Sequence, residues 1–285
     1  MTEEQHFLKI FLHNKKGMAG LIIVLIFVAM GILAPYVTPY SPSYTNPNAF
    51  LLPPSSKHPF GTNVLGQDLL TLDFYGARIS LIVGISAAAI AVGLGLIVGL
   101  FSGYYGGVID EILMRVVDFF IVIPALVFMI IIAALLGPST VNVILVIGML
   151  SWAPTARIIR SMVLSIREWP FVESAKANNA GSLYIMFRHI FPNVSSVLYG
   201  NAMLAVASAI FTQAALVFLG VGNVTDISWG GIIHEAYATG ALDAGDLSYV
   251  IPPGFFIFIL IFGFILIGYA VEEILNPRLR ILKRQ

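Results

Sequence analysis

The sequence predicts an all-α integral membrane protein with six transmembrane helices. Hydrophobic residues make up 58% of the 285 residues, charged residues make up only 11%, and the mean hydropathy is +0.92. This composition is far more apolar than that of a soluble domain. The apolar residues fall in runs long enough to cross a bilayer, and basic residues gather on alternate loops between them. A bundle of membrane-spanning helices accounts for these observations.

The first apolar run follows a short polar tail, residues 1–16, whose basic residues are Lys9, Lys15 and Lys16. Residues 17–34 are uncharged and just long enough to span a bilayer. A basic segment before an apolar run also resembles a signal peptide. However, the end of the run lacks a small-x-small cleavage pattern and more spans follow, so we expect a retained first helix.

A loop and a glycine-rich second span come next. Residues 35–77 are rich in Pro, Ser, Asn and Tyr, which predicts an irregular loop outside the bilayer. A core of five further spans is then expected over 78–272, beginning with a span at 80–101. Small residues recur at every fourth position and should let another helix approach closely; they are Ala87, Ala91, Gly95, Gly99 and Gly103.

The third and fourth spans are expected at about 112–136 and 141–156, separated by a Gly-Pro turn. Arg115 and Asp118 lie three residues apart at the start of the third span, where they can pair. A functional intramembrane role for Asp118 is the alternative, which its closeness to the boundary disfavours.

Residues 157–192 are the only long polar interval in the chain. Pro170 suits the first turn of a short helix over 171–177, and the run 178–181 (Asn-Asn-Ala-Gly) should break it. A second short helix is expected from a cap at Ser182 to Pro192, with four apolar residues on one face: Leu183, Met186, Phe187 and Ile190. Two short amphipathic helices joined by a bend suggest a contact with another protein.

A fifth span is expected at about 195–219, and a sixth at 251–271 after the loop 220–250. Polar residues inside the fifth span have two interpretations: hydrogen bonds between helices, or the lining of a polar pathway. The two are about equally supported for Asn201, Ser208, Thr212 and Gln213. The chain ends with a basic tail, residues 273–285.

The distribution of basic residues predicts the topology. When loops are assigned alternately to the two sides, Lys57 and Arg78 fall on one side and the other 13 of the 15 basic residues fall on the opposite side. The positive-inside rule makes that side cytoplasmic. Both termini and the polar stretch 157–192 are therefore expected in the cytoplasm.

Motifs for enzyme chemistry are missing from the sequence. It has no HExxH zinc motif, no GxSxG elbow, no phosphate-binding GxxxxGK[ST] loop and no cysteine, so no metal site is expected. The centres of the spans are uncharged, whereas ion-coupled carriers usually place ionisable groups there. If the chain transports a solute, energy must therefore enter through a partner.

An ordered set of short motifs resembles the permeases of ABC transporters, and in particular the second permease of the dipeptide, oligopeptide and nickel import group. The polar stretch is similar to their "EAA" coupling loop, with Glu173–Ser174–Ala175, then His189 and Pro192–Asn193. Further matches run through the chain: His58–Thr62, Leu65–Asp68, Tyr75–Ser80, Gly103–Gly107, Met114–Asp118, Phe218–Gly222, Ser228–Gly230 and Asn276–Leu279. Departures are Ser174 for the usual alanine, Gln67 for an arginine, and Asn179 for the glycine of the loop.

The resemblance implies the type I ABC importer permease fold in the plasma membrane of a bacterium or archaeon. The implied partners are membrane lipid, a second permease, two cytoplasmic ATPases that bind ATP and magnesium, and an extracytoplasmic substrate-binding protein that docks on the outer loops. No nucleic acid and no cofactor in this chain are implied. The residues implied in coupling to an ATPase are Glu173, Ala175, Asn179, Gly181, Leu183, Met186, Phe187, Arg188 and His189.

The implied function is ATP-driven import, with peptides favoured as substrates and nickel or oligosaccharides as alternatives within the same group. Outside the group, two classes stay open: a self-sufficient ion-coupled carrier or channel, and a membrane scaffold without a transport role. For the apolar coupling residues, packing against the protein's own spans is the alternative to docking on an ATPase.

Overall fold

The fold is all-helical, as predicted. A computed structural model describes residues 9–223, 226–243 and 245–275, and these form helices and loops with one isolated β-bridge. Residues 1–8 of the N-terminal tail and the basic residues from 276 onward in the C-terminal tail lie outside the described residues.

Five helices in the described ranges are long and apolar enough to cross a membrane, and a bent pair would supply a sixth. The described residues form the following α-helices, some of which join into one span: α2 (Lys15–Val37), α3 (Leu69–Tyr105), α4 (Gly107–Val122), α5 (Ala125–Leu136), α6 (Thr140–Leu150), α7 (Ala153–Ile166), α8 (Pro170–Ala177), α9 (Ser182–Ile185), α10 (Phe191–Phe218), α11 (Trp229–Ala238) and α12 (Ile251–Leu275). Met186–Ile190 form a π-helical turn, and Pro47–Ala49 and Leu247–Tyr249 form 3-10 turns.

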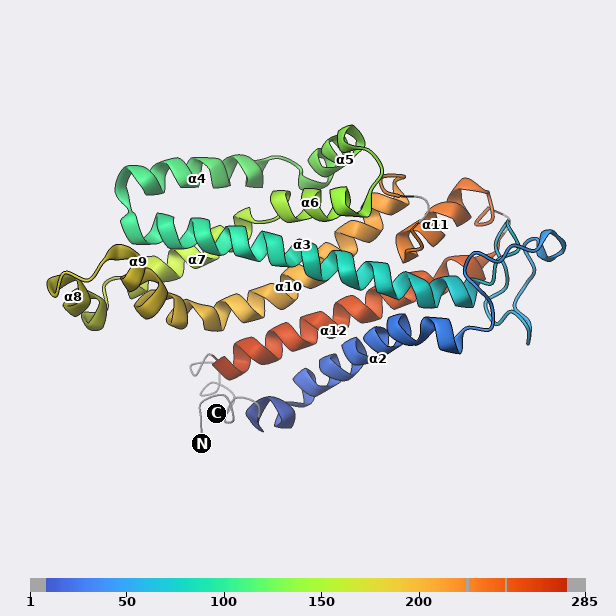
Figure 1. Cartoon of the computed structure of the whole chain (residues 1–285), viewed down its shortest axis with the longest axis horizontal. Helices are drawn as coiled ribbons and strands as arrows, with labels where there is room; N and C mark the ends of the chain where they lie inside the picture. The colour runs from blue at the N-terminus through green and yellow to red at the C-terminus, as the bar shows by residue number, and fades with distance from the viewer. Residues whose placement is uncertain (1–8, 224–225, 244, 276–285) are drawn as a thin grey trace.

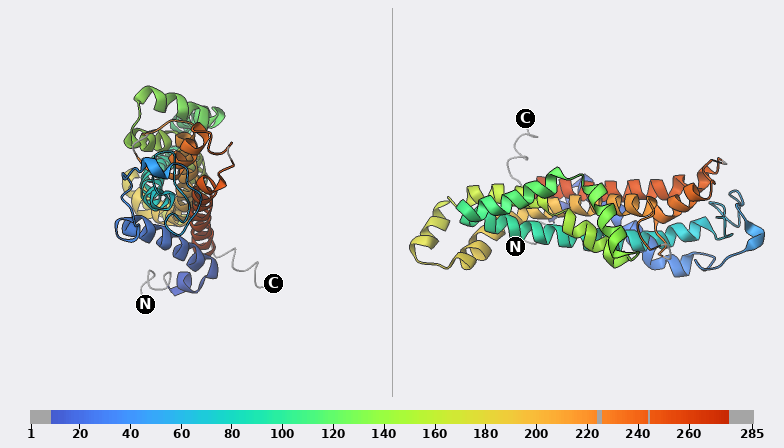
Figure 2. Two further views of the ribbon diagram at one scale, coloured as in Figure 1. Left: turned by 90° about the vertical axis from the view of Figure 1, so that its right-hand side faces the viewer. Right: turned by 90° about the horizontal axis from the view of Figure 1, so that it is seen from above.

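The molecule is elongated, and its two ends differ in structure (Figures 1 and 2). The central helix α3 packs against α2, α6, α7 and α10, and α12 packs against α2 and α10. The short helices α8 and α9 lie at one end, and α2 begins and α12 finishes on the side that faces this end; α11 and the loop 38–68 lie at the other end (Figure 1). We call these the α8 end and the α11 end.

The small residues of the second span bring α3 against α7, which confirms the helix-packing interpretation. A Cβ atom added at Gly99 would lie 2.7 Å from the carbonyl oxygen of Ala156, and one added at Gly103 would lie 2.7 Å from the Cβ of Val163. Each distance is shorter than a normal carbon contact. Larger side chains would therefore push the two helices apart.

The third span differs from the single straight helix that we expected. The chain bends by 90° between α4 and α5, and Ile123 between them is extended, with φ −72° and ψ 133°. The following residue, Pro124, explains the bend: proline disfavours a helical conformation of the residue before it and cannot donate a backbone hydrogen bond.

The polar stretch 157–192 is also more helical than expected. Arg157 and Arg160 lie inside α7, which continues to Ile166. At the other end, Pro192 does not stop a helix, because α9, the π-helical turn and α10 form one 37-residue span, Ser182–Phe218. The backbone N–H of Phe191 bonds the carbonyl of Met186, five residues earlier. This wider turn accommodates a proline whose missing N–H would break a regular helical ladder.

Candidate functional site

The bend at the α8 end is a complete helix-ending motif. Asn179 is in the left-handed conformation with φ 57°. The N–H of Ala180 bonds the carbonyl of Ala175 (3.1 Å), and the N–H of Asn179 bonds that of Lys176 (3.0 Å). This is the Schellman pattern, in which a left-handed residue satisfies the last carbonyls of a helix. Ala175 and Ala180 both pack against the same buried cluster, so Ala175 helps to fix the bend.

The pivot of the bend is Asn179. Gly181, two residues later in the same run, has φ −65°, which any residue adopts, and a Cβ atom there would meet nothing within 4 Å. Asparagine is among the few residues other than glycine that tolerate the left-handed region, so the bend keeps its place. Gly181 is also the cap residue of α9, so the helix begins at Ser182, one residue earlier than the predicted cap at Ser182 implies.

The four apolar residues predicted on one face of the second short helix divide into two pairs. Met186 and Ile190 are fully buried, whereas Leu183 and Phe187 are 58% and 53% exposed. The π-helical turn changes the helical period, so that Ile185 and Ile190, five residues apart, share the buried face. Met186 is therefore part of the chain's own core in this conformation.

Exposed apolar side chains gather around the bend. Leu183 and Phe187 are joined by aromatic residues that our sequence analysis did not single out, and we call the set the bend patch: Trp169, Phe171, Leu183, Tyr184 and Phe187. The imidazole of His189 lies beside the ring of Phe171 (6.2 Å between centroids) and that of Tyr184 (5.5 Å). The signal in the sequence was the presence of aromatic residues within a charged stretch.

The charged residues of the bend differ in their contacts. Glu173 and Arg188 are exposed, and neither takes part in an ion pair within the described ranges. Lys176 lies over the ring of Tyr104, with its Nζ 5.7 Å from the centroid, and Arg167 donates to the carbonyl of Gly103 (3.0 Å). These two contacts attach the bend to the end of α3.

Ion pairs join α4 to α7 close to the bend, and a hydrogen bond adds α3. Arg160 donates to both carboxylate oxygens of Asp110 at 2.5 and 2.6 Å, and Ser102 donates to the same carboxylate. The predicted pair of Arg115 with Asp118 is wrong: Asp118 bonds Arg157 (2.6 Å), and Arg115 lies 3.7 Å from Glu111, four residues earlier on its own helix. Because α4 runs beside α7, the partner of Asp118 comes from the neighbouring helix.

The predicted pathway residues do not share one surface. Asn201 accepts a hydrogen bond from the Thr155 hydroxyl (2.8 Å), and with Ser208 it lines a cavity of about 200 Å³ between α3, α7 and α10. Thr212 donates to the carbonyl of Ser208 in its own helix. Gln213 is buried and lines a different, much smaller cavity. Both interpretations thus hold for Asn201, which lines a cavity and bonds another helix.

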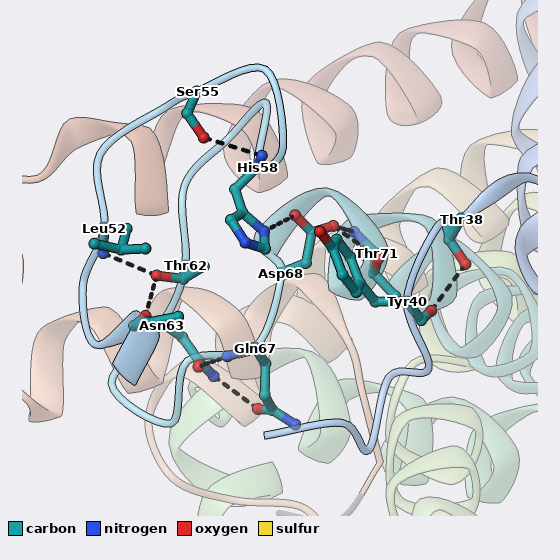
Figure 3. Close-up of polar contacts among 11 residues, drawn as sticks. Thr38, Tyr40, Leu52, Ser55, His58, Thr62, Asn63, Gln67, Asp68 and Thr71 are labelled. Carbon is teal, nitrogen blue, oxygen red and sulfur yellow. Dashed lines mark hydrogen bonds and ion pairs between the residues drawn. The ribbon is translucent and has the colours of Figure 1, made fainter. Parts of the chain in front are cut away.

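The loop 38–68 at the α11 end is fixed by a polar network around Asp68 (Figure 3). The buried carboxylate of Asp68 bonds the Nδ1 of His58 (2.9 Å) and accepts from the backbone N–H and the hydroxyl of Thr71 (2.8 and 2.7 Å), capping α3. Asn63 donates to Gln67 (2.7 Å), and Gln67 donates to the carbonyl of Pro42 (2.8 Å). The motifs His58–Thr62 and Leu65–Asp68 therefore build one compact loop.

Helix α11 was not expected within the loop 220–250. Its first residue, Trp229, is fully buried, donates to the carbonyl of Asp73 in α3 (3.0 Å), and meets the ring of Phe27 edge to face. Ser228 caps the helix through the N–H of Gly231. The match Ser228–Gly230 is thus the segment that fixes α11 to α2 and α3.

Comparisons with known proteins agree with these features. Residues 95–281 match the model described as the binding-protein-dependent transport system inner membrane component, and residues 5–54 match the N-terminal TM domain of oligopeptide transport permease C. A dipeptide transport system permease protein DppC of Bacillus subtilis is 36% identical over 94% of this chain and 83% of its own length.

Two further relatives cover as much. An oligopeptide transport system permease protein OppC of Bacillus subtilis is 35% identical over 95% of this chain and 88% of its own length. A dipeptide transport system permease protein DppC of Haemophilus influenzae is 34% identical over 98% and 96%. The chain therefore belongs to the binding-protein-dependent transport system inner membrane components, the ABC-transporter permeases with the type I importer fold.

Proposed function

We propose that the chain is one of two permease subunits of an ATP-driven importer of dipeptides or oligopeptides. Its partners would be a second permease, two ATPases that bind ATP and magnesium, and an extracytoplasmic substrate-binding protein. The whole-length similarity to permeases named for dipeptide and oligopeptide transport supports the peptide substrate. Hydrolysis of ATP belongs to the partner subunits in this proposal, and the chain needs no cofactor of its own.

The bend patch supports docking on an ATPase, and it is the observation that carries the proposal. Five large apolar side chains, Trp169, Phe171, Leu183, Tyr184 and Phe187, are at least 40% exposed at the tip of the molecule. An exposed cluster of this kind, with Glu173 and Arg188 beside it, has the apolar centre and polar rim of a protein interface. In this proposal Leu183 and Phe187 are buried on docking, whereas Met186 and Ala175 hold the bend in shape.

The orientation follows from the positions of the basic residues. Lys15 and Lys16 begin α2 at the α8 end, and Arg167, Lys176 and Arg188 surround the bend. The positive-inside rule then places the α8 end and both termini in the cytoplasm, and the α11 end outside, where the binding protein would dock.

Movement of the bend would reach the spans through a short route. Lys176 and Arg167 attach the bend to Tyr104 and Gly103 at the end of α3, and α9 is continuous with α10. Closure of the ATPases would therefore displace α3 and α10 together, and the cavity lined by Asn201 and Ser208 lies between these two helices. The bend would thus be a two-state element, and nucleotide binding would shift the equilibrium between its two states.

The experiment is ATP-dependent uptake of a labelled dipeptide by proteoliposomes that contain the full complex with its binding protein. We expect Glu173→Lys to reduce the uptake that ATP drives, without changing the thermal stability of the chain. Glu111→Lys is the matched control, because it reverses an exposed acid at the same end, outside the bend patch. Uptake that needs no ATPase, or equal loss in both variants, would contradict the proposed coupling role.

A further inference from the structure

A small cavity at the α11 end contains an unpaired polar group. It lies where α3, α6 and α10 meet the residues before α11, and its volume of about 10 Å³ is enough for one water-sized particle. Ile79 and Val83 of α3 form an apolar side. The polar residues that line it include Thr140, Gln213, Asp226 and Ser228.

Gln213 points to an occupant of this cavity. The residue is 1% exposed, and its Oε1 has no hydrogen-bond partner within the described part of the chain. Buried amide oxygens are normally paired, because removal from water without a new partner is costly. A bound particle in the cavity would supply the missing partner.

The charge around the cavity favours a cation over a neutral molecule. Asp226 accepts a hydrogen bond from the hydroxyl of Thr140, but none of the ion pairs in the described ranges includes it. None of the described residues that line the cavity is Lys, Arg or His. The lining thus combines one carboxylate with neutral oxygens, the ligands that hard cations prefer.

An open depression gives access from the outside. Its volume is about 610 Å³, and Asp226 and Ser228 belong to the walls of both the depression and the small cavity. The depression adds the carboxylate of Glu235 and the imidazole of His234, and none of the described residues that line it is Lys or Arg. The negative potential of two carboxylates would concentrate cations at the mouth of the cavity.

We propose that this cavity binds one alkali-metal cation, Na⁺ or K⁺, between Gln213, Asp226 and Thr140. A monovalent ion fits a single carboxylate, and no group of three or more His, Cys, Asp or Glu residues suited to a metal occurs within the ranges described. The cation joins α6, α10 and the segment leading to α11, so it stabilises the outer part of the permease. It is independent of the transported substrate.

The test measures thermal unfolding of the purified complex in NaCl, KCl or N-methylglucamine chloride at equal ionic strength. We expect a saturable rise of about 5 °C in Tm with Na⁺ or K⁺, and the ion with the lower half-saturation identifies the natural occupant. Equal Tm values in all three salts would overturn the proposal and leave water as the occupant.

Variants separate the cavity from a general salt effect. Gln213→Leu and Asp226→Asn should lose the response, and Gln213→Glu, which keeps the shape and adds a charge, should lower the half-saturating concentration at least tenfold. Asn142→Ala is the matched control: it removes an amide of α6 that bonds the carbonyls of Leu136 and Gly137, outside the cavity, and should keep the response. A response unchanged in Gln213→Glu would also overturn the assignment.

Discussion

The two ends of this permease differ in where their side chains find contacts. At the α11 end, Asp68, Asn63 and Gln67 each bond other parts of the same loop, and Trp229 is fully buried against α3. At the α8 end, Phe187 is 53% exposed, and the aromatic rings around it contact one another at the surface. The α11 end pairs its polar side chains within one chain, whereas the α8 end leaves large apolar side chains exposed.

Because their contacts differ, substitutions at the two ends should have different effects. The loop 38–68 is held by hydrogen bonds between its own segments, such as that from Gln67 to the carbonyl of Pro42, so a single change there should alter the stability of the chain. The bend packs on buried Val172, Ile185 and Ile190, while the apolar side chains on its other side are exposed. Changes on that surface should alter assembly and leave stability nearly unchanged.

The largest effect on stability is expected at Gly66 in the loop 38–68. Its φ is +70°, and a Cβ atom would lie 1.9 Å from the carbonyl oxygen of Asn46. Gly66→Ala should therefore destabilise the chain by about 4 kcal/mol, since it combines a strained backbone with a clash against another backbone segment. The measurement is thermal unfolding in mild detergent, with limited proteolysis of the loop 38–68.

Gly181→Ala in the bend is the matched control for Gly66→Ala. Gly181 has a negative φ and open space around its Cα, so the same substitution should change the stability by less than about 0.5 kcal/mol. If the two variants unfold at the same temperature, the contrast between the ends is wrong.

The loop 38–68 shows how far the sequence could predict structure. The motif Leu65–Asp68 belongs to the ordered set of motifs on which the resemblance to a family rests, and the loop character of 35–77 followed from its Pro and Asn residues. The need for glycine at position 66 could not be predicted. It depends on Asn46, twenty positions earlier, whose carbonyl oxygen comes close to Gly66 only in the folded loop. Helix α11 was missed for a similar reason: it is short, and buried Trp229 fixes it through a contact with α3.

A smaller effect is expected from the two neighbours Met186 and Phe187. Met186 is fully buried within the chain and Phe187 is exposed. Met186→Ala should destabilise the chain by about 3 kcal/mol through a cavity, whereas Phe187→Ala should cost less than about 0.5 kcal/mol. Thermal unfolding of the isolated permease measures both.

Copurification of the ATPase tests the same pair for function. Phe187→Ala should reduce the amount of ATPase that remains bound to the chain in detergent, because it removes exposed apolar area from the bend patch. If Phe187→Ala destabilises the chain as much as Met186→Ala does, Phe187 packs inside the protein and the bend patch is not a free surface.

The two short helices of the bend lie about where the sequence predicts them, but the apolar residues of the second helix do not share the predicted face. A helical period of 3.6 residues places Leu183, Met186, Phe187 and Ile190 together, and Pro192 normally ends a helix. The π-helical turn Met186–Ile190 changes both expectations, since it shifts the face by one residue and lets α10 continue. The sequence contains no reliable signal for such a turn, because it arises from the packing of Ile185 and Ile190 in the buried cluster.

The smallest effect is expected at the pivot of the bend, Asn179. Its φ of 57° is a conformation that glycine adopts freely, asparagine tolerates and alanine disfavours. Asn179→Gly should stabilise the bend by about 0.5 kcal/mol, and Asn179→Ala should destabilise it by about 1 kcal/mol. Hydrogen exchange at the N–H groups of Asn179 and Ala180, which bond Lys176 and Ala175, reports the opening of the bend itself.

The two Asn179 variants also show whether the shape of the bend matters for docking. Both leave the bend patch unchanged, so ATPase binding should follow the order glycine, asparagine, alanine only if the left-handed pivot positions the patch. If both variants bind the ATPase equally while their exchange rates differ in the expected order, the pivot stabilises the permease alone. Docking would then depend on the exposed side chains and not on the angle between α8 and α9.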